Sequence, residues 1–350
     1  MEMTFRWYGD DDPIPLAYIK QIPRVAGIVS ALYDVQIGEI WPIEKLNLVK
    51  KKIEAVGLKF SVIESLPVHE DIKLGSSTRD EFIDKYSQSI RNIGSLGIKI
   101  ICYNFMPVFD WMRSDLAMKS PDGSNVLSYN HKQVKNIDLG KESLELPGWA
   151  TQYTKKELEK LLDAYSKINE ETLWSNLEYF LKRVIPVAEE CGVKMGIHPD
   201  DPPWSIFNLP RIITEEAALD RFVKLIDSPS NGITFCTGTL SANPKVDLVK
   251  SIRKYGAMDR IPFAHCRNIK RTGEYSFYEV EHPTEFGDVN MYEVIKAFIE
   301  VGFTGAIRPD HGRMIWGEHG KPGYGLYDRA LGSIYLSGLW EGIEKTIKGK

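Results

Sequence analysis

The sequence has few cysteines and no long apolar run. Its four cysteines show no Cys-x-x-Cys spacing, and a chain of 350 residues needs no disulfide framework. No apolar stretch approaches the ~18 residues of a membrane-spanning helix. The first residues lack the basic-then-apolar pattern of a signal peptide. We therefore expect a cytoplasmic protein with reduced thiols and no membrane partner.

An excess of positive charge is also missing. The chain has 44 Lys and Arg against 48 Asp and Glu, a formal net charge of −4, and it contains no basic run. Nucleic acid is therefore not an expected partner, because its binding depends on clustered basic residues. Linkers rich in Pro, Gly or Ser are absent too, so we expect a single domain over residues 1–350.

The sequence does contain a repeated alternation of short apolar runs with amphipathic helical stretches. The runs predict eight strands at 4–9, 27–33, 59–65, 99–105, 194–197, 232–236, 261–265 and 305–308. Helices are expected at 16–22, 42–56, 79–96, 155–166, 171–191, 215–226, 246–255, 291–301 and 324–338. Eight strand–helix units predict an α/β fold, the (β/α)8 TIM barrel, with insertions at about 107–169 and 271–288.

A doubly wound open sheet is the competing fold. Such sheets often bind a pyrophosphate at a glycine-rich first loop. Here the first loop reads Tyr-Gly-Asp-Asp-Asp from Tyr8, and its acidic residues would repel a phosphate. This loop favours the barrel.

Four metal-binding side chains stand at or just past the ends of the last four predicted strands: His198, Cys236, His265 and Asp310. In a barrel, catalytic groups come from these strand ends, and consecutive strands are neighbours. Each residue alone could be structural, as a hydrogen-bonded loop histidine, a buried thiol or a helix cap. Their equivalent positions favour one site for Mn, Fe, Co or Zn. The remaining histidines lack this context and are expected on the surface or in loops: His69, His131, His282 and His319.

Longer strings around these residues resemble the mannonate dehydratase family from end to end. The most specific are His-Pro-Asp-Asp-Pro-Pro from His198 and Arg-Pro-Asp-His-Gly from Arg308. Supporting strings begin at Phe5 (Phe-Arg-Trp-Tyr-Gly), Gly38 (Gly-Glu-Ile-Trp), Phe235 (Phe-Cys-Thr-Gly) and Lys321 (Lys-Pro-Gly-Tyr-Gly). The resemblance implies a lyase of hexuronate (glucuronate) catabolism, dependent on Mn²⁺ or Fe²⁺, on a barrel similar to xylose isomerase. Its implied reaction converts D-mannonate to 2-dehydro-3-deoxy-D-gluconate and water.

His311 and Tyr324 are the candidate acid–base pair for this reaction. Loss of water from a 2,3-dihydroxy acid requires removal of the C2 proton and protonation of the departing C3 hydroxyl. Positioned acid–base groups contribute about 10²–10⁴-fold each. We expect His311 to be the base and Tyr324 the acid, although the sequence also permits the reverse. Strand alternation would point His311 away from Asp310 unless the chain turns there.

Four residues are candidate contacts for the anionic substrate: Trp7, Asn104, Arg267 and Arg308. A guanidinium can hold a carboxylate through two parallel hydrogen bonds. Each candidate has an alternative: Arg308 could pair internally with Glu64, Asn104 could cap a loop, and Trp7 could simply pack. The insertion at about 107–169 could form a lid or an oligomer contact, and we expect a homo-oligomer.

Three other functions are compatible with a barrel. A sugar isomerase or epimerase is the nearest, because Glu-Phe-Gly-Asp from Glu285 is similar to loops of those enzymes, which however place several carboxylates on the metal. A metallohydrolase of the amidohydrolase type would need His-x-His where this chain has Arg6-Trp7-Tyr8. A non-catalytic sugar-acid-binding protein would have little use for His311 and Tyr324.

Overall fold

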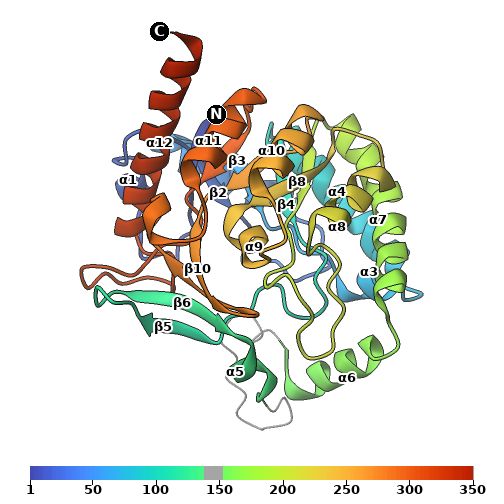
Figure 1. Cartoon of the computed structure of the whole chain (residues 1–350). Helices are drawn as coiled ribbons and strands as arrows, with labels where there is room; N and C mark the ends of the chain where they lie inside the picture. The colour runs from blue at the N-terminus through green and yellow to red at the C-terminus, as the bar shows by residue number, and fades with distance from the viewer. Residues whose placement is uncertain (138–152, 350) are drawn as a thin grey trace.

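The computed structural model describes residues 1–137 and 153–349 and shows a closed barrel of eight parallel strands surrounded by helices (Figure 1). The strand order around the barrel is β1-β12-β9-β8-β7-β4-β3-β2. The strands are β1 (Glu2–Arg6), β2 (Val25–Ser30), β3 (Lys59–Glu64), β4 (Ile100–Tyr103), β7 (Lys194–Ile197), β8 (Asn231–Cys236), β9 (Phe263–His265) and β12 (Ala306–Arg308). They correspond to the eight predicted strands, so the (β/α)8 prediction is confirmed.

The main helices lie around the barrel and bury one apolar face against it. They are α1 (Leu16–Ile19), α2 (Ile43–Ala55), α4 (Arg79–Ser95), α7 (Glu170–Glu190), α8 (Glu216–Leu225), α10 (Leu248–Ala257), α11 (Met291–Glu300) and α12 (Tyr327–Lys348). In α7, Leu173, Leu177 and Phe180 are completely buried at helical spacing. Strand β8 is buried along its whole length, as expected for a parallel strand covered on both faces. The core therefore lies between the barrel and the helices.

Several helical features differ from the prediction. The short helices α3 (Glu70–Leu74), α5 (His131–Lys135) and α9 (Thr237–Ala242) were not expected. The last helix was predicted over 324–338, but it begins at Tyr327 and continues to Lys348. Gly338 does not end it, because a glycine inside a helix costs only about 1 kcal/mol. The helix ends at Gly349, whose φ of 64° is the left-handed conformation of a C-terminal cap.

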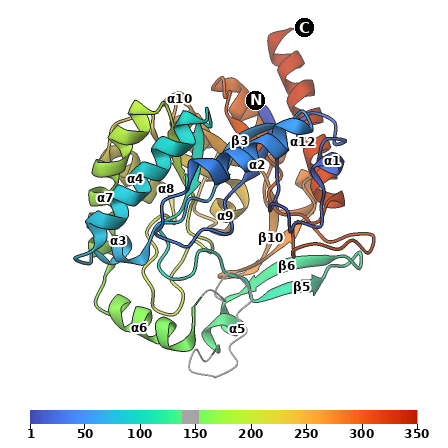
Figure 2. The same cartoon turned by 180° about the vertical axis from the view of Figure 1, so that it is seen from behind.

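The two insertions combine into a second sheet, which the sequence did not predict. After β4 come β5 (Asp115–Lys119), β6 (Asn125–Asn130), α5 (His131–Lys135) and α6 (Lys155–Tyr165); after β9 come β10 (Asn268–Gly273), β11 (Ser276–Val280) and the 3₁₀ turn η2 (Thr284–Phe286). The strand order is β10-β11-β6-β5, and Phe277 pairs with Tyr129 across the two insertions. Figures 1 and 2 show this sheet at the end of the barrel away from both chain termini. Part of the predicted insertion, 138–152, lies outside the described residues.

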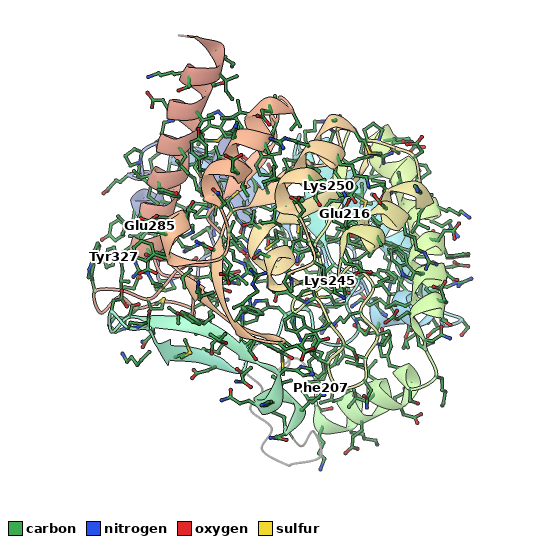
Figure 3. All side chains as sticks on the ribbon, in the orientation of Figure 1. Phe207, Glu216, Lys245, Lys250, Glu285 and Tyr327 are labelled. Carbon is green, nitrogen blue, oxygen red and sulfur yellow. The ribbon has the colours of Figure 1, made fainter. Side chains whose placement is uncertain are left out.

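Charged side chains on the outside link neighbouring helices. For example, Lys250 of α10 reaches Glu216 of α8, with 3.1 Å between Nζ and Oε1 (Figure 3). Such exposed pairs contribute about 0–1 kcal/mol each, so burial of the apolar faces dominates stability. Among the helices of the described residues, none is both long and apolar enough to cross a membrane.

Candidate active site

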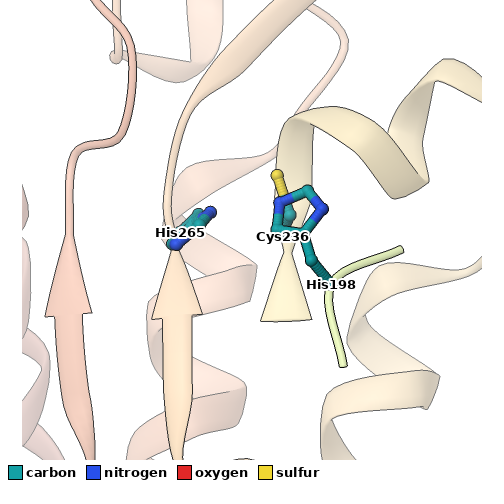
Figure 4. A group of neighbouring side chains, drawn as sticks. All are labelled: His198, Cys236 and His265. Atoms are coloured by element: carbon teal, nitrogen blue, oxygen red, sulfur yellow. The ribbon is translucent and has the colours of Figure 1, made fainter. Parts of the chain in front are cut away.

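Three side chains of types that can bind a metal ion meet at the C-terminal ends of β7, β8 and β9. The ligand atoms of His198, Cys236 and His265 all lie within 4.8 Å of one another. Figure 4 shows Cys236 and His265 at the ends of two strands, with His198 on the segment beside them. Cys236 and His265 are direct partners in the register of β8 with β9. This group, here called the metal-ligand cluster, has a geometry that can hold one metal ion.

The chemistry of the cluster fits a divalent transition metal ion. Both ring nitrogens of His265 are buried without a hydrogen-bond partner, which costs about 1–3 kcal/mol per group unless a ligand satisfies them. The Nδ1 of His198 lies 2.7 Å from the Pro199 carbonyl oxygen, which can only accept, so Nδ1 carries the hydrogen and Nε2 can bind a metal. Burial opposes ionisation of Cys236, but the Arg267 guanidinium and the His198 ring hold its pKa well below the usual range. A thiolate with two imidazoles suits a transition ion.

Asp310 borders the cluster. Its Oδ2 lies 3.8 Å from Sγ of Cys236 and 3.7 Å from Nδ1 of His265. The same carboxylate contacts two arginines, with Oδ1 at 2.7 Å from Nη2 of Arg308 and Oδ2 at 2.9 Å from Nε of Arg267. Burial raises the pKa of Asp310, but Arg308 and the other cationic side chains around it together outweigh that effect and leave the pKa well below its ordinary value. Asp310 is therefore an ionised oxygen donor beside the three other groups.

The chain turns at Asp310. Such a turn is needed if the side chains of Asp310 and His311, which are neighbours in the sequence, are to face the same site. Asp310 has a φ of 63°, in the left-handed region that Asp tolerates better than most residues. This conformation interrupts the alternation of the strand. As a result, both Asp310 and His311 line the same cavity, with 3.7 Å between Oδ1 and Nε2.

His311 and Tyr324 meet in this cavity, which has a volume of about 390 Å³. The Nε2 of His311 lies 2.8 Å from the Tyr324 hydroxyl, and the two rings are edge to face with centroids 4.9 Å apart. Burial, together with the Asp310 carboxylate, raises the pKa of Tyr324, so its hydroxyl keeps its proton at neutral pH. The structure thus joins the two predicted acid–base residues beside the metal-ligand cluster.

Arg308 and Asn104 also line the cavity. The Nη2 of Arg308 lies 2.8 Å from Oε1 of Glu64, so the alternative of an internal ion pair is present. Its Nε and Nη1 are buried without hydrogen-bond partners. Asn104 Oδ1 accepts a hydrogen bond from the Met106 N–H at 3.2 Å, which is the expected loop cap. Both residues therefore have a structural contact and face the cavity as well.

Arg267 and Trp7 do not line the cavity. Arg267 is 1% exposed, and its guanidinium forms ion pairs with three carboxylates, those of Asp201, Glu279 and Asp310. Trp7 packs in the main hydrophobic core, whereas its neighbours Arg6 and Tyr8 point into the cavity, as alternation along the strand dictates. His282, expected on the surface or in a loop, lies in the loop between β11 and η2, where it is buried, and its Nε2 lies 2.8 Å from the Pro309 carbonyl oxygen.

Four buried charges form a closed ring beside the cavity, which one of them, Asp201, also lines, and the sequence did not reveal this ring. Its members are Arg113, Asp201, Arg267 and Glu279, each 1% exposed or less. Successive N–O distances around the ring are 2.8, 2.8, 2.6 and 2.9 Å. Burial opposes ionisation of Glu279, but Arg267 leads the groups that lower its pKa to about 2. Asp201 belongs to the His-Pro-Asp-Asp-Pro-Pro string, so the sequence did contain a signal for it. Arg113 and Glu279 lie in the two insertions, where no regular spacing of apolar residues marks them.

The fold and the site define a class: a (β/α)8 barrel with a buried metal-ligand cluster at the carboxyl ends of its strands. The model of the family described as D-mannonate dehydratase (UxuA) matches residues 1–350. The mannonate dehydratase of Streptococcus uberis is 58% identical over 348 residues, covering 99% of this chain and 100% of that protein. The chain therefore belongs to the D-mannonate dehydratase family, as the sequence motifs indicated.

Solved structures agree with this assignment. The crystal structure of mannonate dehydratase from Streptococcus suis serotype 2 matches with a TM-score of 0.93 and 47% identity, covering 100% of this chain and 96% of that one. A xylose isomerase domain protein from Planctomyces limnophilus matches with a TM-score of 0.55 and 13% identity, covering 100% and 99%. At that identity the second match shows a shared fold alone.

Proposed function

We propose that the chain is a metal-dependent hydro-lyase that converts D-mannonate to 2-dehydro-3-deoxy-D-gluconate and water. The observation that carries this proposal is the contact between His311 and Tyr324 in one cavity with the metal-ligand cluster. The full-length similarity to mannonate dehydratases supports the identity of the substrate.

His198, Cys236 and His265 would hold the metal ion, with Asp310 as a fourth ligand. The support for Asp310 is its ionised carboxylate, less than 4 Å from both Cys236 and His265. We propose Mn²⁺ or Fe²⁺, because imidazole, thiolate and carboxylate together suit such ions better than Mg²⁺ or Ca²⁺. When bound, the ion would supply a Lewis acid that stabilises negative charge on the substrate carboxylate.

Arg308 and Asn104 would orient the substrate. The unpartnered Nε and Nη1 of Arg308 are suited to a carboxylate, which a guanidinium binds through two parallel hydrogen bonds. Asn104 would contact a hydroxyl group farther along the sugar chain. Arg267 and Trp7 receive no substrate contact in this proposal, because neither lines the cavity.

His311 and Tyr324 would carry the two proton transfers. Nε2 of His311 takes the proton from C2, and the electron pair left on C2 forms the C2–C3 double bond as the C3 hydroxyl departs. Tyr324, protonated at neutral pH, donates its proton to that hydroxyl, which leaves as water. The resulting enol becomes the 2-keto acid, and the two side chains return to their starting protonation states through the solvent.

The substrate assignment is tested by product analysis. Protein loaded with Mn²⁺ is incubated with D-mannonate and, separately, with its C2 and C3 epimers, D-gluconate and D-altronate. We expect a 2-keto-3-deoxy acid from D-mannonate and much less from either epimer. Interconversion of sugars without loss of water, or no turnover of D-mannonate while metal binds, would contradict the proposal and favour an isomerase.

We also propose that the chain forms a homo-oligomer. Apolar side chains are exposed along one side of α12, with Tyr327, Leu331 and Ile334 each more than 40% exposed. Trp316, which is 74% exposed, lies against Tyr327, and Figure 3 shows Tyr327 at the edge of the molecule. Association would remove this surface from water. Sedimentation velocity tests the proposal, which a monomer at micromolar concentration would contradict.

A further inference from the structure

Glu279 is the member of the buried charged ring that reaches the acid–base pair. Its Oε1 accepts from three donors: Nη1 of Arg267 at 2.6 Å, Nη2 of Arg113 at 2.9 Å and Nδ1 of His311 at 3.3 Å. The other ring nitrogen of His311 faces the Tyr324 hydroxyl. The imidazole therefore has the Glu279 carboxylate at Nδ1 and the Tyr324 hydroxyl at Nε2, while Oδ1 of Asp310 lies beyond hydrogen-bond distance of Nε2, at 3.7 Å.

This arrangement decides which nitrogen of a neutral His311 carries the proton. An ionised carboxylate can only accept, so the hydrogen in its contact with His311 belongs to Nδ1. A neutral imidazole has one N–H, which leaves a lone pair on Nε2, the nitrogen that lies at the cavity. The opposite tautomer would place the Nδ1 lone pair against a negative oxygen. Glu279 therefore selects the tautomer in which Nε2 can act as a base.

The geometry points to Glu279 as a positioning residue for catalysis: it fixes His311 in the Nδ1–H tautomer and stabilises the imidazolium that forms when Nε2 takes a proton. The source of that proton, C2 of the sugar acid, rests on the function proposed above. In the transfer, the C2–H bond breaks and an Nε2–H bond forms. The Nδ1–H bond stays intact, and Glu279 remains ionised.

The contact with His311 is not needed to balance the buried charges. Two arginines and two carboxylates already neutralise one another within the ring. The orientation of the imidazole is also restricted by edge-to-face contacts with Trp111, at 5.5 Å between centroids, and with Tyr324. Neither aromatic ring can accept the Nδ1 hydrogen in place of a carboxylate. The position of the proton therefore depends on Glu279.

Two substitutions separate the hydrogen bond from the charge. All three donors contact Oε1, while Oε2 is buried without a partner. In Glu279→Gln the amide oxygen can keep all three hydrogen bonds with its NH₂ group at the Oε2 position, so that only the charge is lost. Glu279→Met removes both the acceptor and the charge. Asp201→Asn is the matched control, because it removes one carboxylate from the same ring without touching His311.

The first readout is kinetic, on Mn²⁺-loaded protein. We expect Glu279→Gln to lower kcat about 10–100-fold while KM and metal content stay within about threefold, as is usual for residues that support a reacting group from behind. Glu279→Met should lower kcat at least as far, and Asp201→Asn should lower it less than Glu279→Gln. Unchanged kcat in Glu279→Gln, or an equal loss in Asp201→Asn, would overturn the inference.

The second readout is the tautomer itself, which needs no substrate. Ring-nitrogen NMR of histidine-labelled protein, loaded with diamagnetic Zn²⁺, distinguishes a protonated nitrogen from a bare one, and His311→Asn identifies the signals. We expect Nδ1–H in the wild type, in Glu279→Gln and in Asp201→Asn, and a mixture in Glu279→Met. A wild-type His311 protonated at Nε2 alone would overturn the inference even if D-mannonate proved not to be the substrate. If Glu279→Met does not fold, the kcat values of Glu279→Gln and Asp201→Asn still test whether Glu279 positions His311.

Discussion

At the scale of residues, the site depends on a few backbone and side-chain directions. The left-handed conformation of Asp310 brings a carboxylate and an imidazole into one cavity, and His311 then contacts Tyr324. Placing Asp outside its preferred backbone regions costs about 1–2 kcal/mol. The two arginine contacts of Asp310 offset that cost and hold the turn.

The division of labour between His311 and Tyr324 can be tested by substitution. His311→Asn and Tyr324→Phe should each lower kcat about 10²–10⁴-fold, since each removes one acid–base group. Exchange of the C2 proton of D-mannonate with solvent should persist in Tyr324→Phe and stop in His311→Asn. His319→Asn, on an exposed histidine, serves as the matched control and should keep wild-type kinetics. Exchange that survives in His311→Asn and stops in Tyr324→Phe would reverse the two roles.

The sequence predicted the location of several candidate site residues because strand ends in a barrel have known positions. His198, Cys236 and His265 follow three consecutive strands and meet as expected. The direction of Arg267 could not be predicted in the same way, because it depends on Glu279 and Asp201, which reach it from other segments. Position along a strand is visible in a sequence, whereas a partner from a distant insertion is not.

At the scale of elements, the barrel strands and helices were predictable and the small sheet was not. The barrel strands are continuous apolar runs, and the helices have apolar positions at regular spacing. Strands β5, β6, β10 and β11 have five or six residues each and mix polar with apolar side chains, and β6 pairs with β11 from nearly 150 residues away. Their pairing depends on the barrel bringing the two insertions together, which local sequence does not indicate.

Helix α12 gives a test at this scale. Gly342 is exposed, and a Cβ added there meets nothing within 4 Å, so Gly342→Ala should stabilise the protein by about 0.5–1 kcal/mol. In the same helix, a Cβ at Gly332 would lie 2.6 Å from the buried His282 ring, so Gly332→Ala should lower stability. Urea unfolding measures both. A decrease with Gly342→Ala would show that α12 is not continuous there.

At the scale of the whole molecule, the charged ring ties the two insertions to the barrel. Arg113 comes from the first insertion, Glu279 from the second, and Asp201 and Arg267 from the loops after β7 and β9. Buried charges that lose a partner are costly. The ring therefore holds the small sheet in a fixed position relative to the metal-ligand cluster.

The ring predicts how stability depends on pH. The pKa of Glu279 is about 2 in the folded protein, below its value of about 4.3 in an unfolded chain. The carboxylate therefore contributes stability that is complete above pH ~4.5 and is lost as the pH falls toward 2, on the order of 2–3 kcal/mol. Urea unfolding between pH 7 and pH 3 should show about half of this loss, and Glu279→Gln should show less of it. An identical pH dependence in both proteins would contradict the assignment.

We propose that one metal ion, held by the metal-ligand cluster, makes this chain a dehydratase. The most direct measurement is the rate of 2-keto-3-deoxy acid formation from D-mannonate as metal-stripped protein is titrated with Mn²⁺. The rate should be negligible without metal and should rise in proportion to bound ion until one ion per chain is reached. Cys236→Ser, which lacks the thiolate ligand, should need at least about tenfold more Mn²⁺. Turnover in metal-free protein, or a rate that does not change with the amount of bound Mn²⁺, would contradict this proposal.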